Sequence, residues 1–137
     1  MLTGQCLCGA IKYQYDGPVG PVSLCHCQRC RRAQGGAFSA SAPLQAVRFQ
    51  FTEGEDQVRE FESLPGKYRA FCPNCGSPLY SRVDAIPGIV RLRVGTLDGD
   101  LGKGPASHIY VGSKSDWFQI TDDLPQYDKT ERTNDPH

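Results

Sequence analysis

Seven cysteines in three groups are the residues of this 137-residue chain whose type and spacing could do chemistry. The groups are Cys6-x-Cys8, Cys25-x-Cys27-x-x-Cys30 and Cys72-x-x-Cys75. A structural zinc site is closed by four protein ligands, whereas a catalytic zinc site has three and leaves the fourth position for water or substrate. Seven thiols therefore predict one closed zinc site and one open zinc site, and chemistry is expected at the open site.

Sequence order alone does not settle the pairing, because Cys27-x-x-Cys30 and Cys72-x-x-Cys75 could also form a zinc ribbon. The residues that follow the cysteines favour another arrangement. Cys8 and Cys75 each precede a glycine, and a tight turn around a metal favours a residue that tolerates positive φ. Cys30 precedes an arginine instead. We therefore predict a structural zinc bound by four ligands: Cys6, Cys8, Cys72 and Cys75.

The middle group then supplies three ligands of its own, Cys25, Cys27 and Cys30, to the open and functional zinc. Cys25 and Cys27 are two residues apart, so an extended backbone places both side chains on one face and turns His26 the other way. Cys30 returns to the same metal after a short turn. We therefore expect that His26 is not a zinc ligand.

Charged and aromatic residues near these motifs have two interpretations each. Arg29, Arg31 and Arg32 could moderate the charge of about −1 on a zinc ion with three thiolates and lower the thiol pKa values, or they could form an exposed loop face. A histidine could complete a second structural site, and His108 is the internal candidate, although its apolar surroundings are more typical of a strand residue. Trp117-Phe118 is expected in the core or in a pocket wall.

The elements that position these motifs are expected to be short strands. Glycine and proline make up 25 of the 137 residues, which exceeds the average of roughly 12% and predicts many turns. Residues that alternate between apolar and polar predict half-buried strands, and these cover residues 11–15, 47–51, 68–72 and 90–94, with residues 79–83 and 108–111 as further candidates. One or two helical turns are predicted over residues 28–34, ended by Gly35-Gly36. The fold class is therefore mainly β.

Composition excludes several classes of partner. Lys plus Arg and Asp plus Glu balance at 15 each, so the chain lacks the basic excess of a nucleic-acid-binding domain. No apolar run approaches the 18 or so residues of a membrane span, and residues 1–6 lack the features of a signal peptide. We expect a cytoplasmic protein, whose thiols stay reduced and bind metal rather than form disulfides.

Taken together, the motifs resemble the family of glutathione-dependent formaldehyde-activating enzymes, which is grouped with centromere protein V. The resemblance rests on Cys6-Leu7-Cys8-Gly9, residues 25–32 leading to Gly35-Gly36-Ala37, residues 71–77, residues 95–98, residues 108–110, Trp117-Phe118 and residues 123–125. It extends from about Thr3 to Tyr127. We therefore expect one zinc-binding domain over residues 1–127 and a polar C-terminal tail over residues 128–137.

The resemblance implies a fold of small antiparallel sheets tented around zinc, similar to B-type methionine sulfoxide reductases. It implies the same division into four structural cysteines and three cysteines at the functional zinc, Cys25, Cys27 and Cys30. The reaction that it implies is the addition of glutathione to formaldehyde, which gives S-hydroxymethylglutathione and is a carbon–sulfur lyase reaction in reverse. No glutathione-binding residues can be mapped onto the chain.

Three functions are therefore compared. The leading hypothesis is a zinc-dependent carbon–sulfur lyase that acts on a small thiol adduct, with glutathione as the expected thiol and with neither nucleic acid nor a membrane as partner. The first alternative is a non-enzymatic zinc module that binds another macromolecule. The second is methionine sulfoxide reduction, which needs a redox thiol outside the zinc sites, whereas all seven thiols are assigned to zinc.

Overall fold

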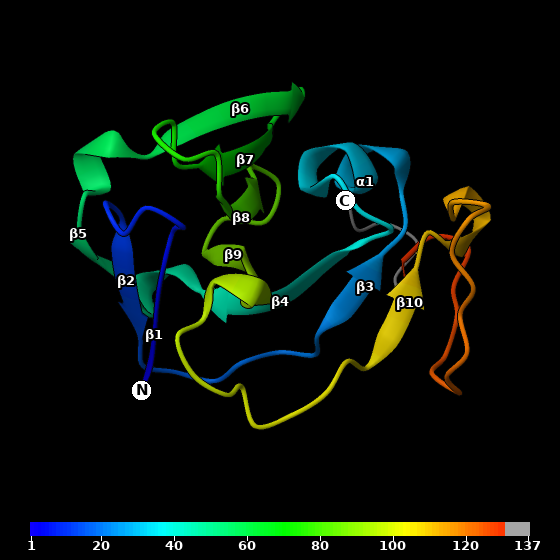
Figure 1. Ribbon diagram of the computed structural model, residues 1–137. Helices are drawn as coiled ribbons and strands as arrows, with labels where there is room; N and C mark the ends of the chain where they lie inside the picture. The colour runs from blue at the N-terminus through cyan, green and yellow to red at the C-terminus, as the bar shows by residue number, and fades with distance from the viewer. Residues whose placement is uncertain (131–137) are drawn as a thin grey trace. The chain divides into compact units, whose positions relative to one another are not determined.

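The computed structural model describes residues 1–130, and its residues form two compact units. The first unit contains Met1–Gly20 and Ala42–Lys103, and the second contains Pro21–Ser41 and the described residues from Gly104 onward. Short strands make up most of the regular structure of the first unit, whereas the second unit combines short strands with a helix, as Figure 1 shows. The fold is therefore mainly β, as the sequence predicted.

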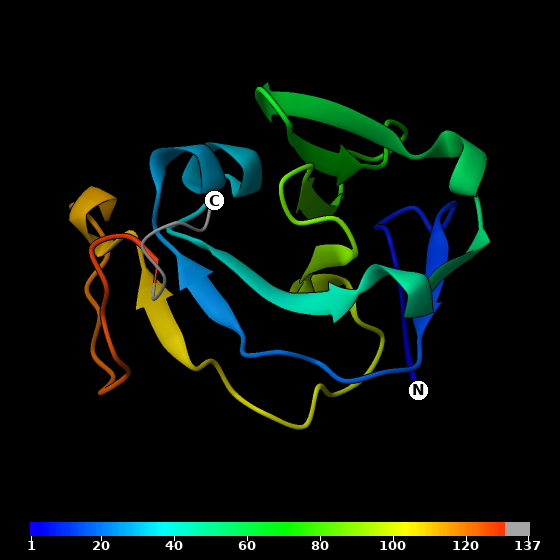
Figure 2. The same cartoon turned by 180° about the vertical axis from the view of Figure 1, so that it is seen from behind.

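One antiparallel sheet of the first unit has three strands in the order β1-β2-β5. These strands are β1 (Leu2–Gln5), β2 (Lys12–Tyr15) and β5 (Phe49–Glu53), which can be followed in Figure 2. The predicted alternation in residues 11–15 is confirmed, since Ile11, Tyr13 and Tyr15 are all buried. Tyr13 and Tyr15 pack with Leu44 and Leu92 in one core cluster.

Four further strands of the first unit are antiparallel neighbours in the order β9-β8-β7-β6. They are β6 (Arg59–Leu64), β7 (Lys67–Phe71), β8 (Pro78–Val83) and β9 (Ile89–Arg93). Short 3-10 helices occupy Ala46–Arg48, Glu55–Gln57 and Val94–Thr96. Ala70 of β7 and Leu79 of β8 pack with Cys6, Ile11 and Cys72, so part of the four-cysteine group lies in the core of this unit.

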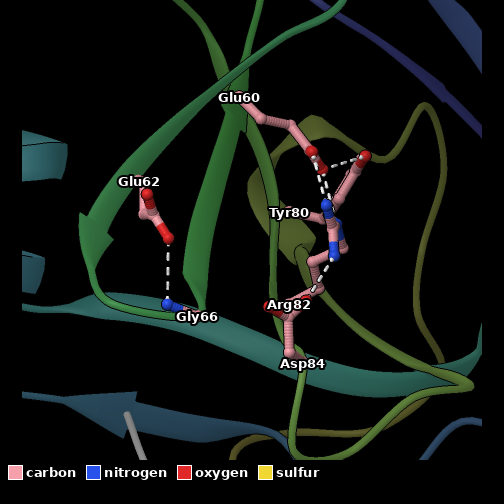
Figure 3. Close-up of polar contacts among 6 residues, drawn as sticks. All are labelled: Glu60, Glu62, Gly66, Tyr80, Arg82 and Asp84. Carbon is pink, nitrogen blue, oxygen red and sulfur yellow. Dashed lines mark hydrogen bonds and ion pairs between the residues drawn. The ribbon is translucent and has the colours of Figure 1, made fainter.

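An ion-pair network joins β6 to β8 (Figure 3). The guanidinium of Arg82 donates to both carboxylate oxygens of Glu60, with both distances 2.8 Å. Tyr80 Oη donates to the same carboxylate at 2.9 Å, and Arg82 also reaches Asp84 at 3.3 Å. The Arg82 guanidinium lies 4.2 Å from the centre of the Tyr68 ring. Hydrogen bonds from Arg82 hold the pKa of Glu60 below its usual range, so this carboxylate stays charged at neutral pH.

The second unit contains β3 (Ser23–Cys25), β10 (Ser107–Ile109), the start of β4 (Ser39–Gln45), the helix α1 (Gln28–Gln34) and a 3-10 helix (Val111–Ser113). β3 pairs with the start of β4 in antiparallel orientation. β3 also pairs with β10, and this pair is parallel. The expectation of antiparallel sheets therefore does not hold for this pair. The helix has the predicted bounds, and Gly35 ends it in a left-handed conformation.

Several expectations about strands need correction. Val47 was expected to be an inward-facing strand residue, but it lies in a 3-10 turn with 85% of its surface exposed, and β5 begins only at Phe49. Arg93 was expected to point outward and is instead buried, with its guanidinium 3.4 Å from Ser81 Oγ. Four strands were not predicted at all: β1, β3, β4 and β6.

Two expectations concern the chain as a whole. Among residues 1–130, no helix is long and apolar enough to span a membrane. The predicted C-terminal tail begins at residue 128, and most of it, residues 131–137, lies outside the described residues. Within the described part, Lys129 O accepts a hydrogen bond of 2.9 Å from Tyr110 N.

Candidate functional site

The structure brings the side chains of Cys6, Cys8, Cys72 and Cys75 together in the first unit. Their sulfur atoms all lie within 4.8 Å of one another. The sulfurs of Cys6 and Cys8 are 3.6 Å apart, and those of Cys8 and Cys72 are 3.9 Å apart. A tetrahedral zinc with Zn–S bonds of about 2.3 Å requires sulfurs about 3.8 Å apart. These four residues therefore fit a closed zinc site.

Two backbone turns of similar construction carry the four sulfurs. In the turn between β1 and β2, Gly9 N donates to Cys6 O at 3.1 Å; in the turn between β7 and β8, Gly76 N donates to Cys72 O at 2.7 Å. Both glycines have positive φ, 79° for Gly9 and 80° for Gly76. This is the left-handed region that L side chains rarely adopt, so the glycines predicted from the sequence are required by the turns.

Hydrogen bonds to the sulfurs favour thiolates at part of this cluster. Asn74 Nδ2 donates to Cys8 Sγ at 3.2 Å and lowers the pKa of that thiol. Ser77 Oγ accepts from Leu7 N and lies 3.4 Å from Cys75 Sγ, so its hydroxyl hydrogen is available to the Cys75 thiolate. This contact lowers the pKa of Cys75 to about 5.

Burial acts in the opposite direction on Cys72 of the same cluster. It raises the pKa of the Cys72 thiol to about 11. Some thiols of this cluster therefore ionise more readily than others. A bound cation would favour deprotonation of all four, because its positive charge stabilises thiolates.

The second cluster consists of Cys25, Cys27 and Cys30, whose sulfurs also lie within 4.8 Å of one another. Cys25 ends β3, Cys27 caps the N-terminus of α1, and Cys30 lies in the first turn of that helix. All three side chains are buried, with 8% of the Cys27 surface exposed and none of Cys25 or Cys30. Cys27 Sγ accepts the Cys30 backbone N–H at 3.3 Å. The structure thus offers three converging sulfurs here, against four in the first unit.

Electrostatics at this second cluster favour a bound cation. Hydrogen bonds with Cys27 and Cys30 raise the pKa of the Cys25 thiol, because three neighbouring sulfurs cannot all carry negative charge when nothing balances it. All seven cysteines are free of disulfides. The donor set of three thiols is one that zinc binds well.

His26 and His108 lie outside both groups of converging ligand atoms. The His26 ring faces His108, and its exclusion from the zinc ligands stays a prediction. His108 is a buried residue of β10, as the strand interpretation predicted, and it does not complete a closed site with the three cysteines.

A hydrogen-bonded chain that sequence reasoning missed connects these histidines with Asp122. His26 Nε2 lies 2.8 Å from His108 Nδ1, and His108 Nε2 lies 3.0 Å from Asp122 Oδ2. The bond to His108 lowers the pKa of Asp122. Burial, followed by the neighbouring His108, lowers the pKa of His26. No local spacing signals this chain, because Asp122 lies 14 residues after His108 in a segment without periodic pattern.

Aromatic side chains enclose His26. The Phe38 and Phe118 ring centres lie 5.5 Å and 6.0 Å from that of His26. Phe118 is therefore part of a wall, as expected, whereas Trp117 has 67% of its surface exposed and belongs to no core. Tyr110 packs against the three-cysteine cluster with a left-handed φ of 56°, an uncommon conformation for an aromatic residue.

The basic residues near the cluster are partly or fully accessible. Arg31 and Arg32 occupy the last turn of α1, where positive charge complements the helix dipole. Arg29 and Arg32 are exposed and Arg31 is half-buried. Their effect on the thiol pKa values stays a prediction.

Comparisons with known proteins agree on a family and a fold. A family model of the glutathione-dependent formaldehyde-activating enzymes matches residues 1–113. A Halomonas elongata protein, whose name provisionally describes it as such an enzyme, is 30% identical in an alignment 128 residues long that covers 88% of this chain and 81% of that protein. The crystal structure of a Rhodobacter sphaeroides protein aligns with a TM-score of 0.63 at 22% identity, over 75% of this chain and 97% of that chain, and shows a shared fold.

Proposed function

This chain belongs to the family of glutathione-dependent formaldehyde-activating enzymes, and we propose that it is a zinc-dependent carbon–sulfur lyase that acts on a small thiol adduct. The proposed substrates in the synthetic direction are glutathione and formaldehyde, as the names of the family and of the Halomonas elongata relative suggest. Zinc is proposed at both cysteine clusters, with a structural role at the first and a catalytic role at the second.

The unequal number of sulfurs at the two clusters is the observation that carries this proposal. Four converging sulfurs complete a tetrahedral zinc site and leave no position for a substrate. Three converging sulfurs leave one position, which is the arrangement of catalytic zinc sites. The cluster of Cys25, Cys27 and Cys30 is therefore the proposed catalytic site.

The proposed reaction adds a thiol to a carbonyl group. The sulfur of glutathione attacks the carbon of formaldehyde, a carbon–sulfur bond forms, and the π bond of the carbonyl opens. The proton that leaves sulfur ends on oxygen, which gives the hydroxyl group of S-hydroxymethylglutathione with no gain or loss of electrons. Zinc at the three-cysteine cluster would supply a binding position at which the incoming thiol is held as its nucleophilic thiolate.

The chain's own residues hold this site in shape. The end of β3 fixes Cys25, and the first turn of α1 fixes Cys27 and Cys30. The hydrogen bond from Cys30 N to Cys27 Sγ sets the orientation of that sulfur. Burial of all three side chains limits the access of water, which strengthens electrostatic interactions within the site.

The proposal extends to organisation and location. Residues 1–127 are proposed as one zinc-binding domain of this family, with residues 128–137 as a polar tail. The proposed location is the cytoplasm, where thiols are reduced and glutathione is abundant. The four cysteines of the first cluster, Cys6, Cys8, Cys72 and Cys75, are proposed as structural ligands only.

Cobalt substitution tests the proposed thiol binding. Cobalt replaces zinc and absorbs visible light, and a new sulfur ligand changes its charge-transfer bands. We expect addition of millimolar glutathione to change the spectrum of the wild-type protein but not that of Cys27→Ala, whose first cluster is intact and serves as the internal reference.

An unchanged wild-type spectrum, with two metals per chain measured, would contradict thiol activation. In that case the three-cysteine site is a structural part of a zinc module that binds another macromolecule. Formaldehyde consumption that depends on glutathione, followed in the zinc protein, tests the named reaction separately.

A further inference from the structure

Ser39 is the first residue of β4 and belongs to the same unit as the three-cysteine cluster. It lies directly opposite Cys25 in the antiparallel pairing of β3 with β4. Residues opposite each other in such a pair place their side chains on the same face of the sheet, with Cβ atoms about 4.5–5.5 Å apart. Ile109 pairs with Cys25 from the other side of β3 and packs against the cysteines. Ile109, Cys25 and Ser39 therefore form one row across three strands.

The hydroxyl group of Ser39 has no hydrogen-bond partner among the residues that the structure describes. The residue is fully buried, so bulk water does not supply a partner either. Most buried polar side chains have a partner, because an unpaired buried hydroxyl group costs free energy. Alanine would occupy the same position in β4 without that cost. The serine therefore points to a partner that becomes available only when the neighbouring cysteines are in their functional state.

Contacts of the other cysteine sulfurs show how this chain surrounds its proposed metal ligands. Cys27 Sγ accepts the Cys30 backbone N–H at 3.3 Å. In the four-cysteine cluster, Ser77 Oγ lies 3.4 Å from Cys75 Sγ. Donors of this kind orient metal ligands and tune their basicity. A serine hydroxyl group beside a ligand sulfur therefore has a precedent in this chain, and Ser39 is placed for the same role in the second cluster.

We propose that Ser39 is a positioning residue of the second zinc site, whose hydroxyl group donates a hydrogen bond to Cys25 Sγ when the three sulfurs hold the metal. The inference rests on the zinc site of the proposed function. In the structure the two groups do not form this hydrogen bond. It forms when the Ser39 side chain turns about its Cα–Cβ bond to another staggered rotamer, because a metal-bound sulfur keeps lone pairs that accept a hydrogen bond.

This hydrogen bond orients one ligand of the open site and withdraws part of its charge. Three thiolates around a zinc ion carry a net charge of about −1, and a donor to one of the sulfurs spreads that charge over a further group. A fourth, anionic ligand such as the thiolate of the substrate is then repelled less. Ser39 therefore prepares the open position for the substrate without touching the substrate itself.

Cadmium-113 spectroscopy of the cadmium-substituted protein tests this hydrogen bond without any assay of activity. In wild type we expect the cadmium at the three-cysteine cluster to show scalar coupling to one hydroxyl proton, transmitted through the sulfur. In Ser39→Ala this coupling should be lost and the cadmium signal should shift. Ser41→Ala is the matched control, because Ser41 is a buried serine on the same face of β4 and lies opposite Ser23 rather than a cysteine. Both cadmium signals should be unchanged in this control.

Competition with a chelator measures the effect on zinc itself. Ser39→Ala should lower the zinc affinity of the three-cysteine site about tenfold and leave the four-cysteine site unchanged. An unshifted second cadmium signal in Ser39→Ala, an equal shift in Ser41→Ala, or an equal loss of affinity at both zinc sites would overturn the role of Ser39. These outcomes leave two metals per chain in the wild type. A wild type that binds only one metal would instead contradict the proposed function, and the inference that rests on it would fall for that separate reason.

Discussion

Individual neighbours help to position the sulfurs of the four-cysteine cluster. Gly9 and Gly76 permit the left-handed turns, and Asn74 and Ser77 lie within hydrogen-bonding distance of the sulfurs of Cys8 and Cys75. Such contacts orient metal ligands and tune their basicity. The metal affinity of this cluster is therefore expected to depend on residues that are not ligands themselves.

Gly76→Ala tests the contribution of one such turn. No atom lies within 4 Å of the position that a Cβ would take, so the cost comes from the φ of 80° alone. We expect a loss of about 1–2 kcal/mol in unfolding free energy, measured by chemical denaturation of the zinc-loaded protein. Gly36→Ala is the control, because that position is equally open and its φ is not positive, and it should cost little or nothing.

Asn74→Ala tests a hydrogen bond to sulfur. Loss of the donor to Cys8 Sγ removes a contact that favours the thiolate. The zinc affinity of the four-cysteine site should therefore fall about tenfold, which is a common effect of removing a hydrogen bond to a metal ligand. Competition with a chelator measures both zinc sites in one titration. The three-cysteine site should be unchanged, and an equal loss at both sites would contradict a local effect.

The strands β6, β7 and β8 are held together by more than their backbone ladders, because Arg82 of β8 pairs with Glu60 of β6 across β7. Both side chains are about one-third exposed, 27% for Glu60 and 36% for Arg82. Solvent therefore screens this pair only in part. The bidentate geometry places the pair at the favourable end of surface ion pairs.

Glu60→Gln should lower the unfolding free energy by about 1 kcal/mol at pH 7. The pKa of Glu60 is lowered in the folded protein, so its stabilising effect is present above the unfolded pKa and is lost as pH falls through the lower folded value. The difference between wild type and variant should therefore vanish under acidic conditions. Glu53→Gln is the control, since its contact with Lys12 is 3.9 Å long and more exposed; a cost equal to that of Glu60→Gln would contradict the argument.

Burial explains which strands could be predicted from the sequence. Residues 11–15, 79–83 and 90–94 alternate because one face of each strand packs into the core, and alternation is what a sequence reveals. β6 could not be found in this way, because Arg59–Leu64 is exposed along most of its length and the charged side chain of Glu60 contacts β8 instead. β3 has only three residues, too few to show a period, and the one buried residue of β1 is Gly4, which carries no apolar signal.

The candidate site could likewise be predicted from the sequence only in part. The sulfur clusters could be predicted, since cysteine spacing and the following glycines carry the signal within a few residues. The partnership of His26, His108 and Asp122 could not, because it joins residues 82 and 14 positions apart that share no pattern. Val47 was wrongly predicted to lie in a strand, because the sequence does not distinguish an apolar residue in a turn from one in a strand.

The two cysteine clusters differ in how much of the chain each one connects. The sulfurs of Cys8 and Cys72 are 3.9 Å apart although 64 residues separate them in sequence, and Cys6 and Cys72 belong to a core cluster of the first unit. The second cluster joins residues only five positions apart, within the second unit. Loss of metal is therefore expected to have different consequences at the two clusters.

Cys75→Ser and Cys27→Ser test this difference. Structural zinc contributes about 10–16 kcal/mol, comparable to the roughly 5–15 kcal/mol stability of a domain, so Cys75→Ser should unfold or precipitate. Cys27→Ser should bind one zinc per chain and keep its β structure, because serine is also a favourable N-cap and can accept the Cys30 N–H that Cys27 Sγ accepts. Metal analysis and circular dichroism measure both outcomes. Complete unfolding of Cys27→Ser would make the second cluster structural, whereas a Cys75→Ser protein with an unchanged melting temperature would show that the first is not required for folding.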